Sequence, residues 1–197
     1  MSPDNEVIER STVEPAAFAM LYDRHATTVF RYVAQRLGDH VADDVMSETF
    51  LVAFERRSTF DTAVSDARPW LLGIATRLMR KHARVEAVAW KGMSAEMAAQ
   101  LAPDFIERAG SRIDAERLAR RLAKALRRLS DVDRDTLLLY AWGDLDYASI
   151  ADAMQVPVGT VRSRLNRARR QLRRAAGTHT VEQEMDHGRT DTASQYS

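Results

Sequence analysis

The chain has no cysteine among its 197 residues, which excludes disulfides and cysteine-ligated zinc sites. No apolar run approaches the roughly 18 residues that a membrane span requires, so we expect no membrane insertion. The opening residues, Met-Ser-Pro-Asp-Asn-Glu, lack the basic and then apolar pattern of a signal peptide, and a cytoplasmic location is expected. Glycine (8) and proline (5) are scarce, and apolar residues recur at helical spacing. The sequence therefore predicts an all-α fold.

Charge is nearly balanced overall, at +1, but it is unevenly distributed. No acidic residue lies between Asp152 and Glu182, and seven arginines fall in this stretch: Arg162, Arg164, Arg167, Arg169, Arg170, Arg173 and Arg174. The run Tyr147–Arg174 has the spacing of a helix, a tight turn and a second, basic helix. This pattern is typical of a helix-turn-helix that places its second helix in the DNA major groove.

The pattern divides the chain into two small helical domains joined by a flexible linker. The segments are a flexible N-terminus (1–12), a first domain (13–85), the linker (86–111), a second domain with the helix-turn-helix (112–175) and a disordered tail (176–197). The linker is placed where glycine, proline, alanine and methionine replace larger apolar residues. The tail is polar and has few large apolar residues.

In the first domain we expect a helix from Pro15 that ends at Gly38, and a second one over 40–57. A polar loop follows over 58–68, and Pro69 begins a third helix. Trp70 opens an apolar stripe on that helix, which favours a core position over a role as a platform for a base.

In the last helix, Val161, Leu165, Ala168 and Leu172 are spaced to pack inward. Residues near the start of such a helix usually contact base edges, and arginines further along are better placed for phosphates. From the arginines alone, a solvated basic helix without a ligand is an equally good interpretation.

Three segments resemble a known family. Pro157-Val-Gly-Thr-Val-Arg-Ser-Arg-Leu is similar to the −35-reading motif of the extracytoplasmic-function (ECF) group of bacterial sigma-70 factors. Asp43-Asp-Val-Met-Ser-Glu-Thr-Phe resembles the family's segment that binds the β′ clamp of RNA polymerase. Arg68-Pro-Trp-Leu-Leu-Gly-Ile-Ala-Thr-Arg-Leu resembles its −10 helix. The order and spacing of the three match the family over most of residues 13–175.

The resemblance implies three sets of site residues. For the −35 element they are Thr160, Arg162, Ser163, Arg164, Arg167 and Arg170. For the −10 element they are Arg57, Phe60, Asp61, Arg77, Arg80, Lys81 and Arg84. For core polymerase they are Asp43, Asp44, Ser47, Glu48 and Leu51. The loop with Phe60 and Asp61 corresponds to the family's loop that holds a flipped −10 base.

The chain departs from the family pattern at four positions. Ser47 replaces a common glutamine, Arg77 an asparagine, Lys81 an aspartate, and Gln155 the glycine of the helix-turn-helix turn. Because Gln155 is not glycine, it must tolerate or avoid a left-handed backbone.

The implied function is promoter-specific initiation of transcription by core RNA polymerase, with contacts to the β′ clamp and the β flap, and with an anti-sigma factor as a further expected partner. The alternative is a stand-alone helix-turn-helix regulator whose N-terminal half dimerises or binds a ligand. An enzyme is not expected, because the five histidines lack metal spacing and no P-loop or nucleophile elbow is present. We expect no cofactor and no metal.

Overall fold

The computed structural model describes residues 2–103 and 111–177, and over these ranges the chain forms helices and turns without any strand. The all-α prediction is thereby confirmed. The α-helices are α1 (Asp4–Val13), α2 (Ala19–Leu37), α3 (Asp39–Glu55), α4 (Arg68–Met79), α5 (Ala83–Ala89), α6 (Ala95–Leu101), α8 (Arg112–Arg128), α9 (Asp131–Ala141), α10 (Tyr147–Met154) and α11 (Val158–Ala176). Short 3-10 segments are η1 (Pro15–Phe18), η2 (Arg57–Thr59), η3 (Arg80–His82) and η4 (Trp90–Gly92). Within the described ranges no helix combines the length and apolar character needed to span a bilayer.

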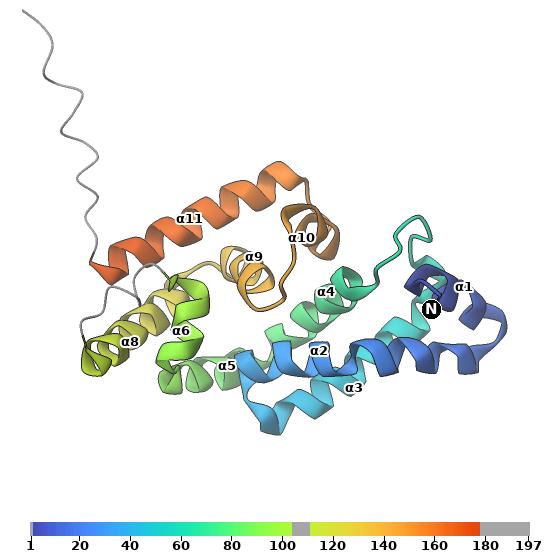
Figure 1. Cartoon of the computed structure of the whole chain (residues 1–197), viewed down its shortest axis with the longest axis horizontal. Coiled ribbons are helices and arrows are strands. Elements are labelled where there is room, and N and C mark those ends of the chain that lie inside the picture. Colours follow the sequence, from blue (N-terminus) through green and yellow to red (C-terminus); the bar gives the residue numbers. More distant parts are fainter. Residues whose placement is uncertain (1, 104–110, 178–197) are drawn as a thin grey trace, which may run out of the picture.

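The N-terminal half is built on α2, α3 and α4, which pack together (Figure 1). Gly38 ends α2, as its position in the sequence predicts, and its φ of 84° is a backbone conformation that favours glycine. The helix begun at Pro69 is also present, since α4 has this proline in its first turn. Leu21, Leu37 and Leu71 are fully buried between these helices.

The C-terminal half contains α8, α9 and the helix-turn-helix formed by α10 and α11. Side-chain caps start three of these helices: Ser111, Ser130 and Asp146 each accept a hydrogen bond from the backbone N–H three residues later. The apolar stripe predicted on α11 is buried against α8 and α9; it consists of Val161, Leu165, Ala168 and Leu172. Gln155 tolerates the left-handed conformation at the end of α10, with φ 55° and ψ 51°.

The N-terminus differs from the flexible segment predicted over 1–12. Residues Asp4–Val13 form α1, and Val7 and Ile8 are each only 1% exposed. The helix escaped prediction because it is short and has few apolar residues, so its periodicity is weak. Its anchoring depends on contacts with distant residues, which a local pattern cannot reveal.

The segment predicted as a flexible linker is largely folded. Helices α5 and α6 and the η4 turn occupy residues 83–101, with Glu86 and Trp90 buried at 4% and 2% exposure. Small side chains suggested a linker, but Ala98 and Leu101 pack against the body of the protein. Residues 104–110 of the predicted linker, and the predicted tail from 178 onwards, lie outside the described residues.

The two halves contact each other through α4 and α10 (Figure 1). Gly73 of α4 lies against the backbone of Ala153 in α10, so closely that a β-carbon at residue 73 would clash with the Ala153 carbonyl oxygen. The glycine is therefore required by the close approach of the two helices, even though its own backbone is ordinary α-helix.

Candidate nucleic-acid and polymerase surfaces

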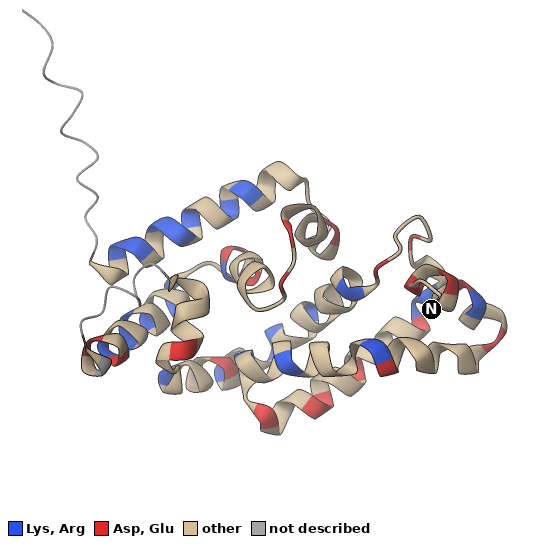
Figure 2. Ribbon diagram, viewed as in Figure 1, with Lys and Arg blue, Asp and Glu red and all other residues tan. Residues whose placement is uncertain are grey.

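Helix α11 carries a row of arginines along one side of the C-terminal half (Figure 2). Arg162 and Arg170 are exposed, and Thr160 and Arg164 are partly buried near the helix start. The hydroxyl of Ser163 donates to the carbonyl oxygen of Thr160 at 2.9 Å. The exposed guanidinium groups can bond base edges or phosphates without breaking a contact that packs the helix.

Two other arginines of α11 stabilise the domain itself. Arg167 makes a two-point ion pair with Asp133 of α9, with N···O distances of 3.1 and 2.7 Å. The hydrogen bonds and charge of Asp133 raise the pKa of Arg167 above its ordinary value. Arg169 lies 4.7 Å above the ring of Tyr140 and donates to the Tyr147 hydroxyl. Arg167, one of the predicted −35 residues, is thus already paired with a carboxylate of the protein, that of Asp133.

A cavity of about 420 Å³ lies between the loop after α3, the start of α4 and the end of α10. Phe60 and Trp70 form part of its wall, with their rings edge to face at a centroid distance of 5.1 Å. Asp61 and Arg77 complete the side from the N-terminal half. Trp70 is only partly buried and lines this cavity, although the sequence favoured the core. Aromatic walls with a nearby cation are suited to an unstacked nucleic-acid base.

Arg77 places a guanidinium group in the cavity wall, beside Arg56 and the aspartates Asp61, Asp66 and Asp152. Partial burial lowers its pKa, and repulsion from Arg56 and Arg80 lowers it further. The guanidinium remains charged at neutral pH because arginine starts from so high a value. Its Nη1 atom donates to the Ala153 carbonyl oxygen at 3.3 Å, so the same residue touches both halves of the protein.

The other predicted −10 residues have different surroundings. Arg57 donates to the carbonyl oxygens of Ser11 and Phe54 and lies 3.9 Å above the Phe54 ring, which ties it into the fold. Arg80 and Lys81 are each paired with a carboxylate, Asp135 at 3.2 Å and Glu48 at 2.6 Å respectively. Arg84 is exposed on α5. The η3 segment separates α4 from α5, so Arg77 and Arg84 do not lie on the face of one continuous α-helix.

The predicted polymerase-binding residues lie on α3, where red ribbon segments mark acidic residues along the lower edge of the molecule (Figure 2). Asp43, Asp44 and Ser47 are exposed, and Leu51 has 58% of its surface exposed. The opposite face, with Met46 and Phe50, is buried at 8% and 5% exposure. An exposed leucine among carboxylates can be buried against a basic and apolar partner.

Family comparisons match both halves of the chain. Residues 21–87 match the sigma-70 region 2 family, and residues 119–172 match sigma-70, region 4. Among curated relatives, the ECF RNA polymerase sigma factor SigL of Mycobacterium tuberculosis is 30% identical over 83% of this chain and 90% of its own length. The ECF RNA polymerase sigma factor BldN of Streptomyces coelicolor is 33% identical over 86% of this chain and 64% of its own length.

The chain belongs to the ECF group of sigma-70 factors.

Solved structures agree with this sigma-factor fold. CnrH, in complex with the cytosolic domain of CnrY, is similar with a TM-score of 0.57 and 22% identity, covering 86% of this chain and 94% of that one. The sigma factor RpoE of Bartonella quintana, in complex with the anti-sigma factor NepR, gives a TM-score of 0.53 and 16% identity, with coverage of 82% and 98%.

A buried ion-pair network joins region 2 to region 4 of this sigma factor. Arg36 of α2 is 1% exposed and donates to Glu86 of α5 at 2.6 Å and to Asp135 of α9 at 2.9 Å. Burial alone would lower the pKa of Arg36, but the charges around it raise the pKa instead. Arg80 and Arg134 add further ion pairs to Asp135 and Glu86.

Sequence reasoning missed this network, although one signal was present. Arg36 falls seven residues after Val29 on the apolar stripe of α2, and an arginine at a core position needs carboxylate partners. The identity of those partners could not be inferred, because Glu86 and Asp135 lie 50 and 99 residues away.

Proposed function

We propose that this sigma factor binds core RNA polymerase through the outer face of α3, reads the −35 element through α11 and captures an unstacked −10 base in the cavity. The main support for this proposal is the cavity. Its wall includes Phe60, Trp70 and Arg77, which lie in the half of the chain that matches region 2. A neighbouring aromatic and cationic surface is what capture of a single-stranded base requires. The protein acts in the cytoplasm, as a specificity subunit with no chemistry of its own.

Region 4 contributes the exposed start of α11. Arg162 offers a fork that can bond guanine O6 and N7 together, while Arg170 lies two turns further along and is placed for phosphate. Arg167 keeps its contact with Asp133 and orients α11 on α9. Its contribution to DNA binding is accordingly smaller than that of Arg162.

Binding both promoter elements requires the two halves to separate. Elements named −35 and −10 are about 25 base pairs apart, or roughly 85 Å along the duplex at 3.4 Å per base pair. In the structure Gln155 lines the same cavity as Phe60, and only three residues, about 11 Å of chain at most, lead from Gln155 to the start of α11. In the promoter-bound state we therefore place α10 away from α4. This removes the α10 side of the cavity and leaves the base to bind the wall formed by Phe60, Trp70 and Arg77.

An anti-sigma factor is the second proposed partner. Both solved structures named above are complexes: CnrH is bound to the cytosolic domain of CnrY, and the sigma factor RpoE is bound to the anti-sigma factor NepR. A protein that stabilises the contact between α4 and α10 would keep the DNA-reading surfaces together and block initiation.

Run-off transcription with core polymerase and a promoter library tests the leading proposal. We expect transcripts that depend on the added chain. Leu51→Ala should weaken core binding about tenfold, because it removes apolar surface that docking buries. Val13→Ala is the matched control, since Val13 is an 89% exposed apolar residue on α1 rather than on α3.

Two results would count against the proposal. Active core that yields no factor-dependent transcript from any promoter would contradict initiation. DNA binding without co-purification of core would favour a stand-alone helix-turn-helix regulator.

A further inference from the structure

Helix α1 is bonded to the loop that lines the cavity. The backbone N–H of Asp4 donates to the Ser65 carbonyl oxygen at 3.1 Å, and the Asn5 side-chain amide donates to the Thr62 carbonyl oxygen at 2.8 Å. In the other direction, the N–H of Ala67 donates to the Asp4 carboxylate at 3.0 Å. Three hydrogen bonds thus join the first turn of α1 to both ends of the segment 62–67.

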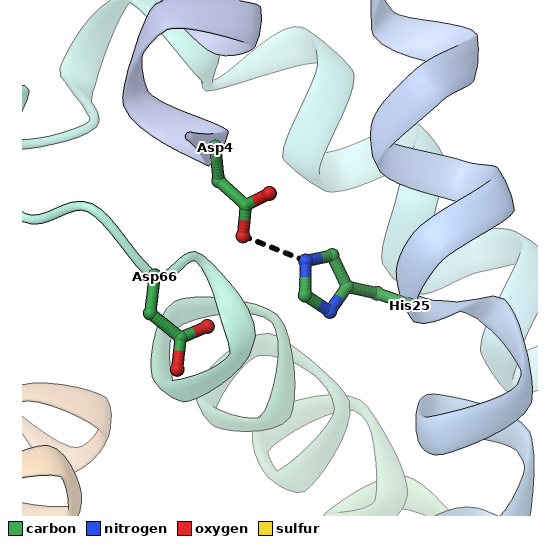
Figure 3. Close-up of side chains that lie close together, drawn as sticks. All are labelled: Asp4, His25 and Asp66. Carbon is green, nitrogen blue, oxygen red and sulfur yellow. Dashed lines mark hydrogen bonds and ion pairs between the residues drawn. The ribbon is translucent and has the colours of Figure 1, made fainter. Parts of the chain in front are cut away.

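The Asp4 carboxylate is itself held by two side chains of α2, Arg24 and His25, of which His25 is drawn in Figure 3. Oδ1 accepts from Arg24 at 2.9 Å, and Oδ2 lies 2.7 Å from Nε2 of His25. Asp4 is 7% exposed, so these charge-assisted contacts are shielded from water. One side chain therefore connects α1, α2 and the loop.

Asp4, His25 and Asp66 also lie close enough together to suggest a metal site. The contacts of Asp4 argue otherwise. Both of its oxygens already accept hydrogen bonds, and a guanidinium cation lies 2.9 Å away. The arrangement fits an anchor for the loop better than a cation site.

The loop depends on this anchor because it has few bonds of its own. Within it, the N–H groups of Ala63 and Val64 bond Asp61, which makes a local turn, but Thr62 and Ser65 direct their carbonyl oxygens to α1. Asp61, Val64 and Asp66 of the same loop line the cavity. A change in α1 therefore reaches the cavity wall without any contact between α1 and a ligand.

We propose that α1, through Asp4, is a positioning element that holds the loop 61–67 in the shape needed to capture the unstacked −10 base. This proposal builds on the function proposed above. Asp4 does not touch DNA; it acts through the backbone of the loop. The loop loses its conformational entropy during folding. Less entropy is therefore lost when the base binds, so capture is more favourable.

Hydrogen exchange tests the anchor directly in the full chain. In Asp4→Asn, the neutral amide cannot accept from both Arg24 and His25 as the carboxylate does, and loss of charge-assisted bonds should speed amide exchange in residues 61–67 about tenfold or more. Asn5→Ala removes only the bond to Thr62 and provides a second variant should Asp4→Asn fold poorly. Glu9→Gln, an exposed position on the same helix, is the charge-matched control. Exchange in α3 and α9 serves as the internal reference for global stability.

Transcription by the same variants tests the consequence. On a duplex promoter chosen with the wild-type chain, Asp4→Asn should reduce permanganate reactivity of −10 thymines and run-off product about tenfold, whereas Glu9→Gln should not. A template with a mismatched, already open −10 region should restore most of the loss, because capture no longer has to compete with base pairing. General instability of the protein would instead reduce the run-off product from both templates equally.

Each outcome is decisive. Unchanged exchange in 61–67 in both variants overturns the anchor. Faster exchange with unchanged opening of duplex promoters overturns its role in base capture. If the wild-type chain itself drives no transcription, the proposed function fails, while the exchange data still decide whether α1 holds the loop.

Discussion

Gly73 and Ala153 lie in different halves of the chain, yet they meet so closely that no β-carbon fits between them. This contact brings the first helix of the helix-turn-helix onto the helix proposed to read −10. It also places Ala153 and Gln155 in the wall of the cavity. The close packing of α4 against α10 therefore depends on the absence of a side chain at residue 73.

Replacing Gly73 with alanine should push α10 off α4. We expect a loss of about 1–3 kcal/mol from overpacking, and a longer distance between the halves. Because the chain has no native cysteine, spin labels at Thr27→Cys on α2 and Gln171→Cys on α11 can report that distance. Gly159→Ala is the matched control, since a β-carbon there meets nothing within 4 Å. An unaltered label distance in Gly73→Ala would show that the interface adjusts without opening.

Neutralising Asp135 should destabilise the protein strongly. Asp135 is 1% exposed, and Asp135→Asn leaves Arg36 in a buried site with one fewer counter-charge, which typically costs about 3–5 kcal/mol. Urea unfolding measures the change. Asp131→Asn is the control: it removes a pair with Arg134, but Asp131 is 70% exposed, so the loss should stay below about 1 kcal/mol. Equal losses in the two variants would contradict a special role for the buried network.

The arginines of α11 should separate into base-reading and phosphate-binding residues. Arg162→Ala should reduce discrimination between the preferred and a mutated −35 duplex by about 1–3 kcal/mol. Arg170→Ala should weaken binding to both duplexes alike. It should also reduce the magnitude of the slope of log K against log salt by about 1. Fluorescence anisotropy over a salt series distinguishes these effects. Loss of affinity without loss of discrimination in Arg162→Ala would assign that residue to phosphate instead.

Acid should release α1 through Asp4. Burial alone would raise the pKa of Asp4, but hydrogen bonds from Ala67, Arg24 and His25 outweigh burial and hold the pKa below its ordinary value of 3.8. A carboxyl with a lowered pKa contributes stability above its unfolded pKa and loses it as the pH falls through the folded pKa. Exchange in 61–67 should therefore accelerate relative to α9 as the pH falls below about 3.8, after correction for intrinsic exchange rates. In Asp4→Asn this pH-dependent step should be absent.

Local chemistry was enough to predict the main helices. Gly38 and Pro69 mark an end and a start that the structure contains, and the Val161–Leu172 stripe is buried as its spacing indicates. The resemblance to ECF sigma factors also agreed with the family matches to both halves. These features depend on residues that are close together in the chain, so they can be recognised in a single sequence.

The sequence did not predict the features that depend on distant partners. The anchoring of α1 requires Ser65 and Ala67, about 60 residues away, and the folded stretch around Trp90 packs through contacts that its many small residues concealed. The resemblance placed Arg167 among the −35 residues, and no local pattern could show that it also pairs with Asp133, 34 residues away. In each case the deciding interaction joins segments whose proximity is a result of folding.

Arg36 and Asp135 limit how halves of this family can be recombined. Their 2.9 Å contact crosses from region 2 to region 4 in the interior of the protein. A chimera that joins the first 103 residues of this chain to the C-terminal half of a relative must supply a carboxylate at the position of Asp135. Without it, the buried guanidinium keeps Glu86 but loses its carboxylate partner in region 4. The hybrid then retains both DNA-reading surfaces on a less stable fold.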